Sequence, residues 1–221
     1  MKLVLFDCDG TLVDSAGLIH EVMARTFEDF GLARVSLEAT KSIIGLTLDI
    51  AIARLMHQPH VDDRAIAMTA HYKKIYGGVR AEMDFREPLF PGIAGLLATL
   101  SARDALILGA VTGKSRRGLD QICASHGYEK TFFVSRTADD CPSKPHPAMV
   151  TECCSEAGID PKDTIVIGDA IYDMQMAKSA GAAAIGVAWG YASVSELVEA
   201  GADHIAQAPN DILDWMETHH A

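Results

Sequence analysis

The chain begins with a short apolar stretch that ends abruptly in acidic residues. Residues 2–6 are mostly apolar, and Asp7 and Asp9 follow them, with Gly10 and Thr11 next. A short apolar run bounded by turn residues is typical of a buried strand in a parallel sheet. Ligands bind at the carboxyl ends of such strands, so both aspartates are candidate site residues, although an Asx-turn alone would also account for them.

Residues 15–87 show apolar side chains at helical spacing and no strand pattern. Four helices are predicted, beginning near Ser15, Ser36, Thr47 and Asp62. The first is predicted to end at Gly31 and the last at Gly77-Gly78, because glycine is common at helix C-termini. An all-helical segment placed between one strand and the next predicts a small domain inserted after the first strand.

From Pro91 onward, strand and helix patterns alternate. Apolar runs predict strands over residues 105–111, 131–135, 164–167 and 182–187. Helical spacing predicts helices around residues 91–100, 115–123, 147–157, 173–180, 194–200 and 211–217. This alternation predicts an α/β fold: a parallel sheet connected by right-handed crossovers, with helices on both faces.

Composition and charge narrow the function classes. The 221 residues are 49% hydrophobic and 22% charged, as in a globular protein with its own core. No apolar run approaches about 18 residues, so no membrane partner is expected. The apolar start is too short for a signal peptide, and we expect a cytoplasmic monomer or homodimer.

The net charge of −11 disfavours binding to nucleic acid, because a phosphate backbone is bound by clustered lysines and arginines. The five cysteines are scattered along the sequence and predict neither a disulfide framework nor a zinc knuckle.

Polar residues follow several of the predicted strands. Asp7 and Asp9 follow the first, Thr112 the second, and Asp169 the strand over residues 164–167. Lys144 lies just before a predicted helix; taken alone, it would be a surface charge. Because the carboxyl ends of parallel strands meet at one edge of a sheet, these residues are predicted to share one site.

Four motifs in this order resemble the haloacid dehalogenase-like hydrolase superfamily. They are residues 7–14, Thr112-Gly113-Lys114, Lys144-Pro145 and residues 168–173. The resemblance implies a Rossmann-like core over residues 1–14 and 88–221, with an all-helical cap over residues 15–87. It is nearest to the phosphoglycolate phosphatase-like members.

The resemblance also implies roles for these residues and a small phosphorylated metabolite as substrate. Asp7 would attack phosphorus, and Asp9 would protonate the leaving alcohol and later accept a proton from water. Thr112 and Lys144 would bind the phosphoryl group. Mg²⁺ would be held by Asp7, the backbone carbonyl of Asp9, and Asp169, with the side chain of Asp173 in the second shell or as a weaker ligand. Asp173 could also be a helix N-cap, and the two roles are compatible.

Two other functions stay open beside a phosphatase: a β-phosphoglucomutase-like mutase and a non-catalytic phosphate-binding regulator. Members of the mutase group have a histidine where this chain has Ile19, with His20 one residue off, and an arginine where it has Leu48. Both departures disfavour the mutase. Asp9 argues against carbon–halogen cleavage, because dehalogenases lack this second aspartate.

Several further residues carry weaker expectations. Lys114 is predicted to face solvent and Ser115 to cap a helix, and Asp14 is a structural or hinge candidate. Trp189 and Tyr191 are expected to pack against the core, with a place at the border of the cap as the alternative. The candidates for substrate selection in the cap are His20, Gly45, Thr47 and Arg54, each of which could equally be a surface or packing residue.

Overall fold

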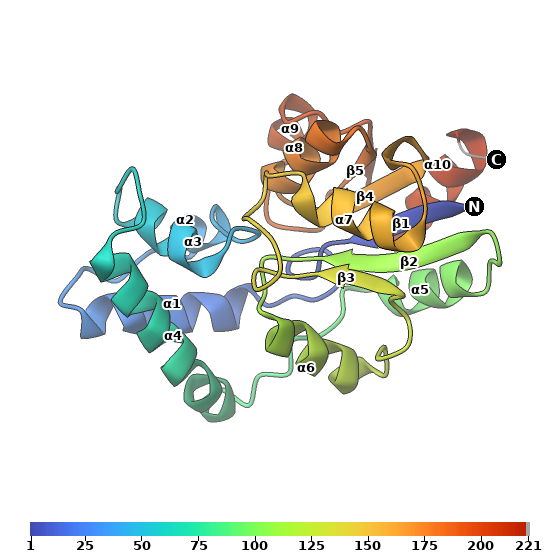
Figure 1. Ribbon diagram of the computed structural model, residues 1–221. Coiled ribbons are helices and arrows are strands. Elements are labelled where there is room, and N and C mark those ends of the chain that lie inside the picture. The colour runs from blue at the N-terminus through green and yellow to red at the C-terminus, as the bar shows by residue number, and fades with distance from the viewer. Residues whose placement is uncertain (220–221) are drawn as a thin grey trace.

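The computed structural model describes residues 1–219 (Figure 1). A six-stranded parallel sheet forms the centre of the larger part of the molecule, which we refer to as the sheet domain or core. The strand order is β3-β2-β1-β4-β5-β6. The strands are β1 (Lys2–Phe6), β2 (Leu106–Val111), β3 (Val134–Arg136), β4 (Thr164–Gly168), β5 (Ala183–Val187) and β6 (His204–Ala206). The α/β fold predicted from the sequence is confirmed.

Side chains of the central strand alternate between the two faces of the sheet, as the two-residue period of a strand requires. Val4 and Phe6 pack with α5 (Ile93–Ser101), α6 (Arg116–His126) and α10 (Pro209–His219) on one face. Leu3 and Leu5 pack with α7 (Ala148–Ala157), α8 (Ile171–Ala180) and α9 (Val194–Glu199) on the other. A 3-10 turn, Pro161–Asp163, leads into β4. The sheet is therefore buried on both faces, which explains the nearly continuous apolar character of β1.

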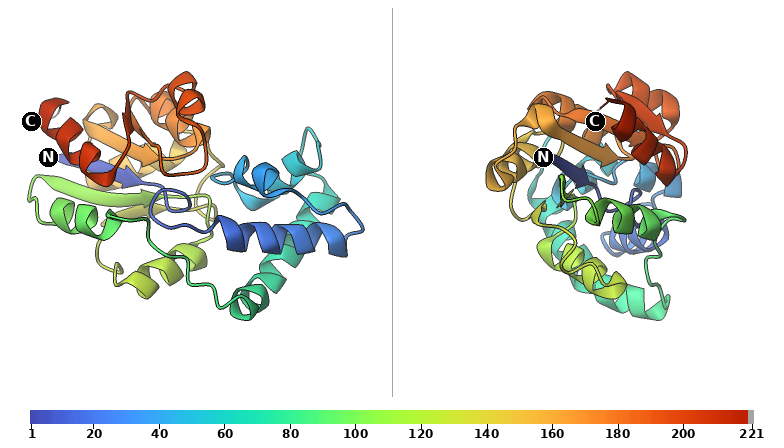
Figure 2. Two further views of the ribbon diagram at one scale, coloured as in Figure 1. Left: turned by 180° about the vertical axis from the view of Figure 1, so that it is seen from behind. Right: turned by 90° about the vertical axis from the view of Figure 1, so that its right-hand side faces the viewer.

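The remaining helices form a separate lobe beside the carboxyl ends of the strands (Figures 1 and 2). They are α1 (Ala16–Asp29), α2 (Leu37–Lys41), α3 (Leu48–Leu55) and α4 (Asp63–Glu82). Their apolar faces form a hydrophobic cluster of their own, which also takes in Ala170 and Tyr172 at the start of α8. The chain enters and leaves the lobe through two adjacent linkers, which are joined by the hydrogen bond of 2.8 Å from Asp14 N to Pro88 O. We refer to this lobe as the cap.

The clearest differences from the predicted elements are two boundaries and one strand. Helix α4 continues through Gly77 and Gly78 to Glu82, because both glycines keep helical backbone and Val79 packs in the cap core. Strand β3 begins at Val134, where pairing with Gly109 starts, and not at residue 131. Strand β6 was not predicted, because three residues are too few to show a period.

Across residues 1–219, no helix has the length and apolar character needed to cross a membrane.

Candidate active site

The strand order brings the predicted site residues to one edge of the sheet. β1 lies between β2 and β4, so the residues after these three strands are neighbours. Asp7 and Asp9 follow β1, Thr112 follows β2 and Asp169 follows β4. The structure therefore brings together residues that are separated by up to 162 positions in the sequence, as the parallel arrangement predicted.

Three aspartates form a buried cluster at this edge. One carboxylate oxygen each of Asp7, Asp169 and Asp173 lies within 4.8 Å of the other two. All three residues are at most 1% exposed. Oδ2 of Asp7 has no hydrogen-bond partner among residues 1–219. Buried carboxylates that lack donors are costly, and a hard divalent cation with oxygen ligands would satisfy them.

Lys144 is buried against this acidic cluster. Its Nζ lies 2.9 Å from Oδ1 of Asp7 and 2.6 Å from Oδ1 of Asp173. Burial lowers the pKa of Lys144, but the Asp173 and Asp7 carboxylates outweigh burial and raise it above its usual range. The structure thus makes Lys144 a fixed positive charge in the site and not a surface residue.

One lysine does not balance three buried carboxylates. Burial raises the pKa of Asp7 to about 7, with the Asp173 carboxylate adding to the rise and Lys144 opposing it. Burial and the neighbouring Asp7 and Asp173 carboxylates also raise the pKa of Asp169 well above its usual range. If all three ionise, the cluster with Lys144 carries two uncompensated negative charges, which match one divalent cation.

Asp169 is oriented by two donors from separate loops. The Thr11 hydroxyl donates to Oδ1 at 3.0 Å, and the Tyr191 backbone amide donates to Oδ2 at 2.9 Å. Gly10 has a φ of +82°, and a Cβ there would lie 2.1 Å from Oδ2 of Asp169. Glycine is therefore needed at position 10 both for the turn and for the approach of the two loops.

Asp173 is not a helix N-cap, because α8 already begins at Ile171. Its Oδ2 accepts a hydrogen bond of 3.0 Å from the Ala170 amide, and its Oδ1 contacts Lys144. Both oxygens of Asp173 therefore have donors within the protein. This favours a role in holding Lys144 beside the carboxylates.

Asp9 points to the cap side of the site. Its Oδ1 accepts a hydrogen bond from the Ser15 hydroxyl and lies 2.7 Å from Nζ of Lys114. The prediction that Lys114 faces solvent is wrong, since its side chain is 10% exposed and also contacts Glu87 at 3.1 Å. Burial lowers the pKa of Lys114, but Asp9, Tyr76 and Glu87 raise it well above the usual range. Lys114 is charged and held between two carboxylates.

Thr112 is fully buried at the end of β2. Its backbone amide donates to Arg136 O at 3.0 Å, as a continuation of the sheet, and so is not free for a ligand. Its hydroxyl accepts from the Lys114 amide at 3.2 Å, and the hydroxyl proton remains available to donate. Ser115 caps α6 as predicted, because its hydroxyl accepts from the Gly118 amide at 3.2 Å.

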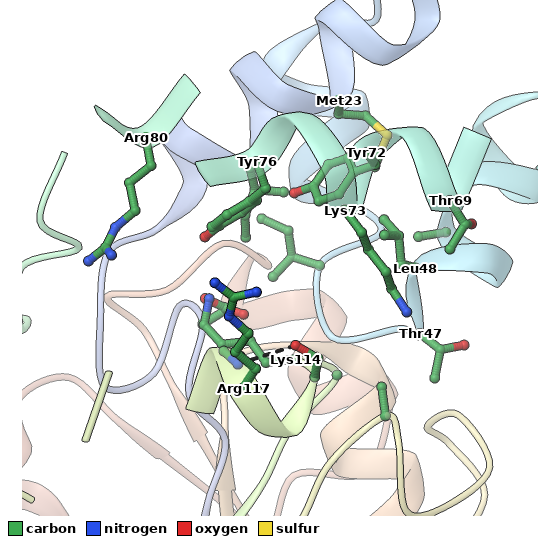
Figure 3. Close-up of a pocket in the computed structure, with 18 of the residues that line it drawn as sticks. Met23, Thr47, Leu48, Thr69, Tyr72, Lys73, Tyr76, Arg80, Lys114 and Arg117 are labelled. Atoms are coloured by element: carbon green, nitrogen blue, oxygen red, sulfur yellow. Dashed lines mark hydrogen bonds and ion pairs between the residues drawn. The ribbon is translucent and has the colours of Figure 1, made fainter. Parts of the chain in front are cut away.

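A cavity of about 1020 Å³ lies between the cap and the sheet domain, next to Asp9 (Figure 3). Tyr72, Tyr76 and Arg80 line it from α4, and Lys114 and Arg117 from the sheet domain (Figure 3). The cavity is large enough for a small metabolite.

The sequence did not predict four of the residues that line this cavity: Glu87, Tyr76, Arg80 and Arg117. Nothing in their spacing distinguishes them from ordinary helix and linker residues.

The predicted cap candidates divide into two groups. Gly45 and Thr47 line the cavity, whereas His20 and Arg54 are not among its lining residues. His20 Nδ1 lies 3.1 Å from the Thr40 hydroxyl inside the cap. The Arg54 guanidinium donates to the Tyr172 hydroxyl at 2.8 Å and lies over its ring, so it joins cap to core.

Trp189 and Tyr191 anchor the loops that carry the aspartates. Trp189 packs against the core, as predicted, and donates to Thr11 O at 3.1 Å. The Tyr191 hydroxyl accepts from the Ser15 amide at 3.0 Å and donates to the Asp14 carboxylate at 3.1 Å. Asp14 thus has a structural contact at the first cap linker.

Comparison with known proteins agrees with this geometry. Residues 4–187 match the haloacid dehalogenase-like hydrolase family. The chain is 30% identical over 214 residues to the probable phosphatase IndB of Dickeya dadantii, covering 96% of this chain and 91% of that protein. It is also 30% identical over 223 residues to a phosphoglycolate phosphatase of Chromobacterium violaceum, covering 98% and 97%.

Solved structures share the whole fold. A predicted phosphoglycolate phosphatase from Haemophilus somnus has a TM-score of 0.81 at 27% identity, covering 98% of both chains. A structure described as a putative β-phosphoglucomutase, from Bacteroides vulgatus, has a TM-score of 0.79 at 24% identity, covering 99% of this chain and 88% of that one. The second likeness is one of fold alone. With the family match over most of its length, this chain belongs to the haloacid dehalogenase-like hydrolases.

Proposed function

We propose that this protein is a magnesium-dependent phosphatase that hydrolyses a small phosphate monoester, phosphoglycolate-like or a sugar phosphate. The reaction would pass through an aspartyl-phosphate on Asp7. The observation that carries the proposal is the buried Asp7 carboxylate, whose Oδ2 lacks a hydrogen-bond partner among residues 1–219 and lies among two further carboxylates and Lys144. The phosphatase names of the two relatives support the reaction class.

In the first step, an oxygen of Asp7 attacks phosphorus and the bond from phosphorus to the leaving alcohol breaks. Asp9, which enters this step protonated, gives its proton to that alcohol. In the second step, water attacks phosphorus, the bond between Asp7 and phosphorus breaks, and Asp9 takes a proton from the water. Inorganic phosphate then leaves, and both carboxyl groups return to their starting states.

The acidic cluster fits a magnesium ion, whose hard oxygen ligands it would supply. Asp7, Asp169 and the backbone carbonyl of Asp9 would hold the ion, with Asp173 supporting Lys144 behind them. Bound Mg²⁺ supplies positive charge that offsets the phosphoryl oxygens. The two uncompensated charges of the cluster favour a divalent over a monovalent ion.

Lys144 and Thr112 would bind the transferring phosphoryl group. The Lys144 ammonium is held by Asp7 and Asp173, so its charge needs little reorganisation during the reaction. The free proton of the Thr112 hydroxyl can be donated to a phosphoryl oxygen.

Residues 15–87 would form the cap that selects the substrate and excludes water. The cavity between cap and core contains Asp9, and cations from both sides reach it: Lys73 and Arg80 from α4 and Arg117 from α6 (Figure 3). These charges make an anionic metabolite a suitable occupant despite the net charge of −11.

The test is phosphate release from phosphoglycolate, several sugar phosphates and p-nitrophenyl phosphate, with Mg²⁺ and with EDTA. Magnesium-dependent release from at least one ester is expected, and its absence from all of them would refute the proposal. β-Glucose 1-phosphate separates the alternatives: a mutase would form glucose 6-phosphate, and a regulator would bind an ester and form no product.

A further inference from the structure

Glu87 lies in the second linker, where the chain returns from the cap to the sheet domain. Its side chain is 4% exposed. Its backbone φ is +45°, in the left-handed region that residues other than glycine rarely adopt. The linker therefore keeps this carboxylate inside at some cost in backbone strain, a pattern typical of functional positions.

The Glu87 carboxylate joins groups from both domains. From the cap, the Tyr76 hydroxyl donates to Oε1 at 3.2 Å, and Nε of Arg80 lies 3.4 Å from Oε2. From the sheet domain, Nζ of Lys114 donates to Oε1 at 3.1 Å. His126 Nε2 also donates to the backbone carbonyl of Glu87 at 3.0 Å. Glu87 therefore connects helix α4 of the cap to Lys114 of the sheet domain.

Lys114 extends this network to the site. Its Nζ lies 2.7 Å from Oδ1 of Asp9, so Glu87 is separated from Asp9 by one side chain. Among residues 1–219, the one further side-chain contact of Asp9 is with the Ser15 hydroxyl at the first linker. Ser15 connects the Asp9 carboxylate to the first linker directly, and Lys114 connects it to the second linker through Glu87.

We propose that Glu87 is a positioning residue which, through Lys114, orients the Asp9 carboxylate when the cap is docked on the core. The inference rests on the proposed function, in which Asp9 protonates the leaving alcohol. If α4 moved away from the core, Glu87 would lose its contacts with Tyr76 and Arg80. Lys114 would then no longer be held in a fixed position. Proton donation would then be competent only with the cap in position, when water is excluded from the site.

The test compares two phosphate esters that differ in their leaving group. An alkoxide needs a proton to leave, whereas p-nitrophenolate leaves without one, so misplacement of Asp9 should slow the first step only for esters of alcohols. The second step uses Asp9 as a base for both esters, so the two esters are compared by kcat/KM, which reports the steps up to departure of the leaving group. Glu87→Gln keeps the shape and removes the charge that holds Lys114. We expect kcat/KM for an alkyl phosphate to fall on the order of 10- to 100-fold and kcat/KM for p-nitrophenyl phosphate to fall less than about threefold.

Glu82→Gln is the matched control, because Glu82 is the last residue of α4, just before the linker that carries Glu87, and forms an exposed ion pair of 2.6 Å with Arg25. It should leave both rates unchanged. Lys114→Met should show the same leaving-group dependence as Glu87→Gln, and the double variant should lose little more than either one, since the two residues act in series.

Equal losses on both esters, or no loss on either, would overturn the inference. If Glu87→Gln does not fold, as judged by circular dichroism and thermal unfolding, Arg80→Gln carries the test, because it loosens Glu87 from the cap side only. Arg80 also lines the cavity, so the readout is the ratio of kcat/KM for the alkyl ester to that for p-nitrophenyl phosphate, in which a binding loss shared by both esters cancels. Arg80→Gln should lower this ratio, and an unchanged ratio would overturn the inference as well. Failure of the proposed function would be distinct, since the unmodified protein would then release no phosphate from either ester.

Discussion

Two lysines in this molecule each bridge a pair of carboxylates, and the two clusters differ in where their members come from. Lys144 contacts Asp7 and Asp173, and all three belong to the sheet domain. Lys114 contacts Asp9 and Glu87, and Glu87 in turn contacts cap residues Tyr76 and Arg80. We call Lys144 with Asp7, Asp169 and Asp173 the inner cluster, and Lys114 with Asp9, Glu87 and Arg80 the outer cluster. The inner cluster therefore contains no cap residue, whereas the outer cluster does.

The clusters also differ in charge. The inner cluster has three carboxylates and one lysine, whereas the outer cluster has two carboxylates facing Lys114 and Arg80. A balanced cluster is satisfied by its own ion pairs, but an unbalanced buried one needs a cation or protons. The comparison teaches that the inner cluster needs a cation or protons from outside its own side chains, whereas the contacts around Asp9 involve residues of the cap.

The largest effect is expected from Asp7→Asn, which removes the proposed nucleophile and one charge of the inner cluster. Turnover should fall on the order of 10⁴-fold or more, while circular dichroism shows an intact fold. Asp160→Asn, at an exposed ion pair with Lys162, is the control and should keep full activity. Retention of wild-type rates in Asp7→Asn would show that another group attacks phosphorus.

Replacing each lysine by methionine compares the clusters directly. Lys144→Met leaves buried carboxylates without their cation and should lower the free energy of unfolding by about 3–5 kcal/mol at neutral pH without metal. Lys114→Met should cost less, about 1–3 kcal/mol, because its cluster retains Arg80 and lies beside a cavity. Urea unfolding measures both values. Equal losses would show that the two clusters are energetically alike.

The inner cluster should also give the metal-free protein an unusual pH dependence. Asp7 has a folded pKa of about 7, above its unfolded value of about 3.9, so the folded state binds the extra proton between these values. The free energy of unfolding should therefore fall as pH rises from about 4 to about 7.

Magnesium competes with that proton, so its affinity should rise with pH by up to about tenfold per unit and level off above about pH 7. Calorimetric titration and urea unfolding at several pH values measure both trends. Asp7→Asn is the reference, since it lacks the titrating group. An Asp7→Asn variant with the same pH slopes would place the titration elsewhere.

The smallest effect is expected at the contact that the Tyr172 hydroxyl makes between cap and core. The Tyr172 hydroxyl donates to Ser42 O at 3.0 Å and accepts from Arg54 at 2.8 Å. Tyr172→Phe removes both bonds but keeps the packing, and should weaken cap docking by about 1 kcal/mol. KM should rise by about two- to fivefold with kcat nearly unchanged. An unaltered KM would mean that these bonds do not limit docking.

The sequence by itself determined which residues meet at the inner site. Asp7, Thr112 and Asp169 each follow an apolar strand, and parallel strands with right-handed crossovers must present their carboxyl ends at one edge. The apolar periodicity of residues 15–87 likewise determined a helical insertion. These are local patterns, so they can be read along the chain.

Only the tertiary structure decided the outer cluster. Lys114 follows a strand and precedes a helix, a position that suggests solvent exposure, yet Asp9 and Glu87 hold it inside. Glu87 and Arg80 carry no local pattern, because their partners come from both domains and meet only when the two linkers lie together. Local periodicity predicts the faces of helices and strands, whereas contacts between domains depend on how those domains dock, which no local pattern specifies.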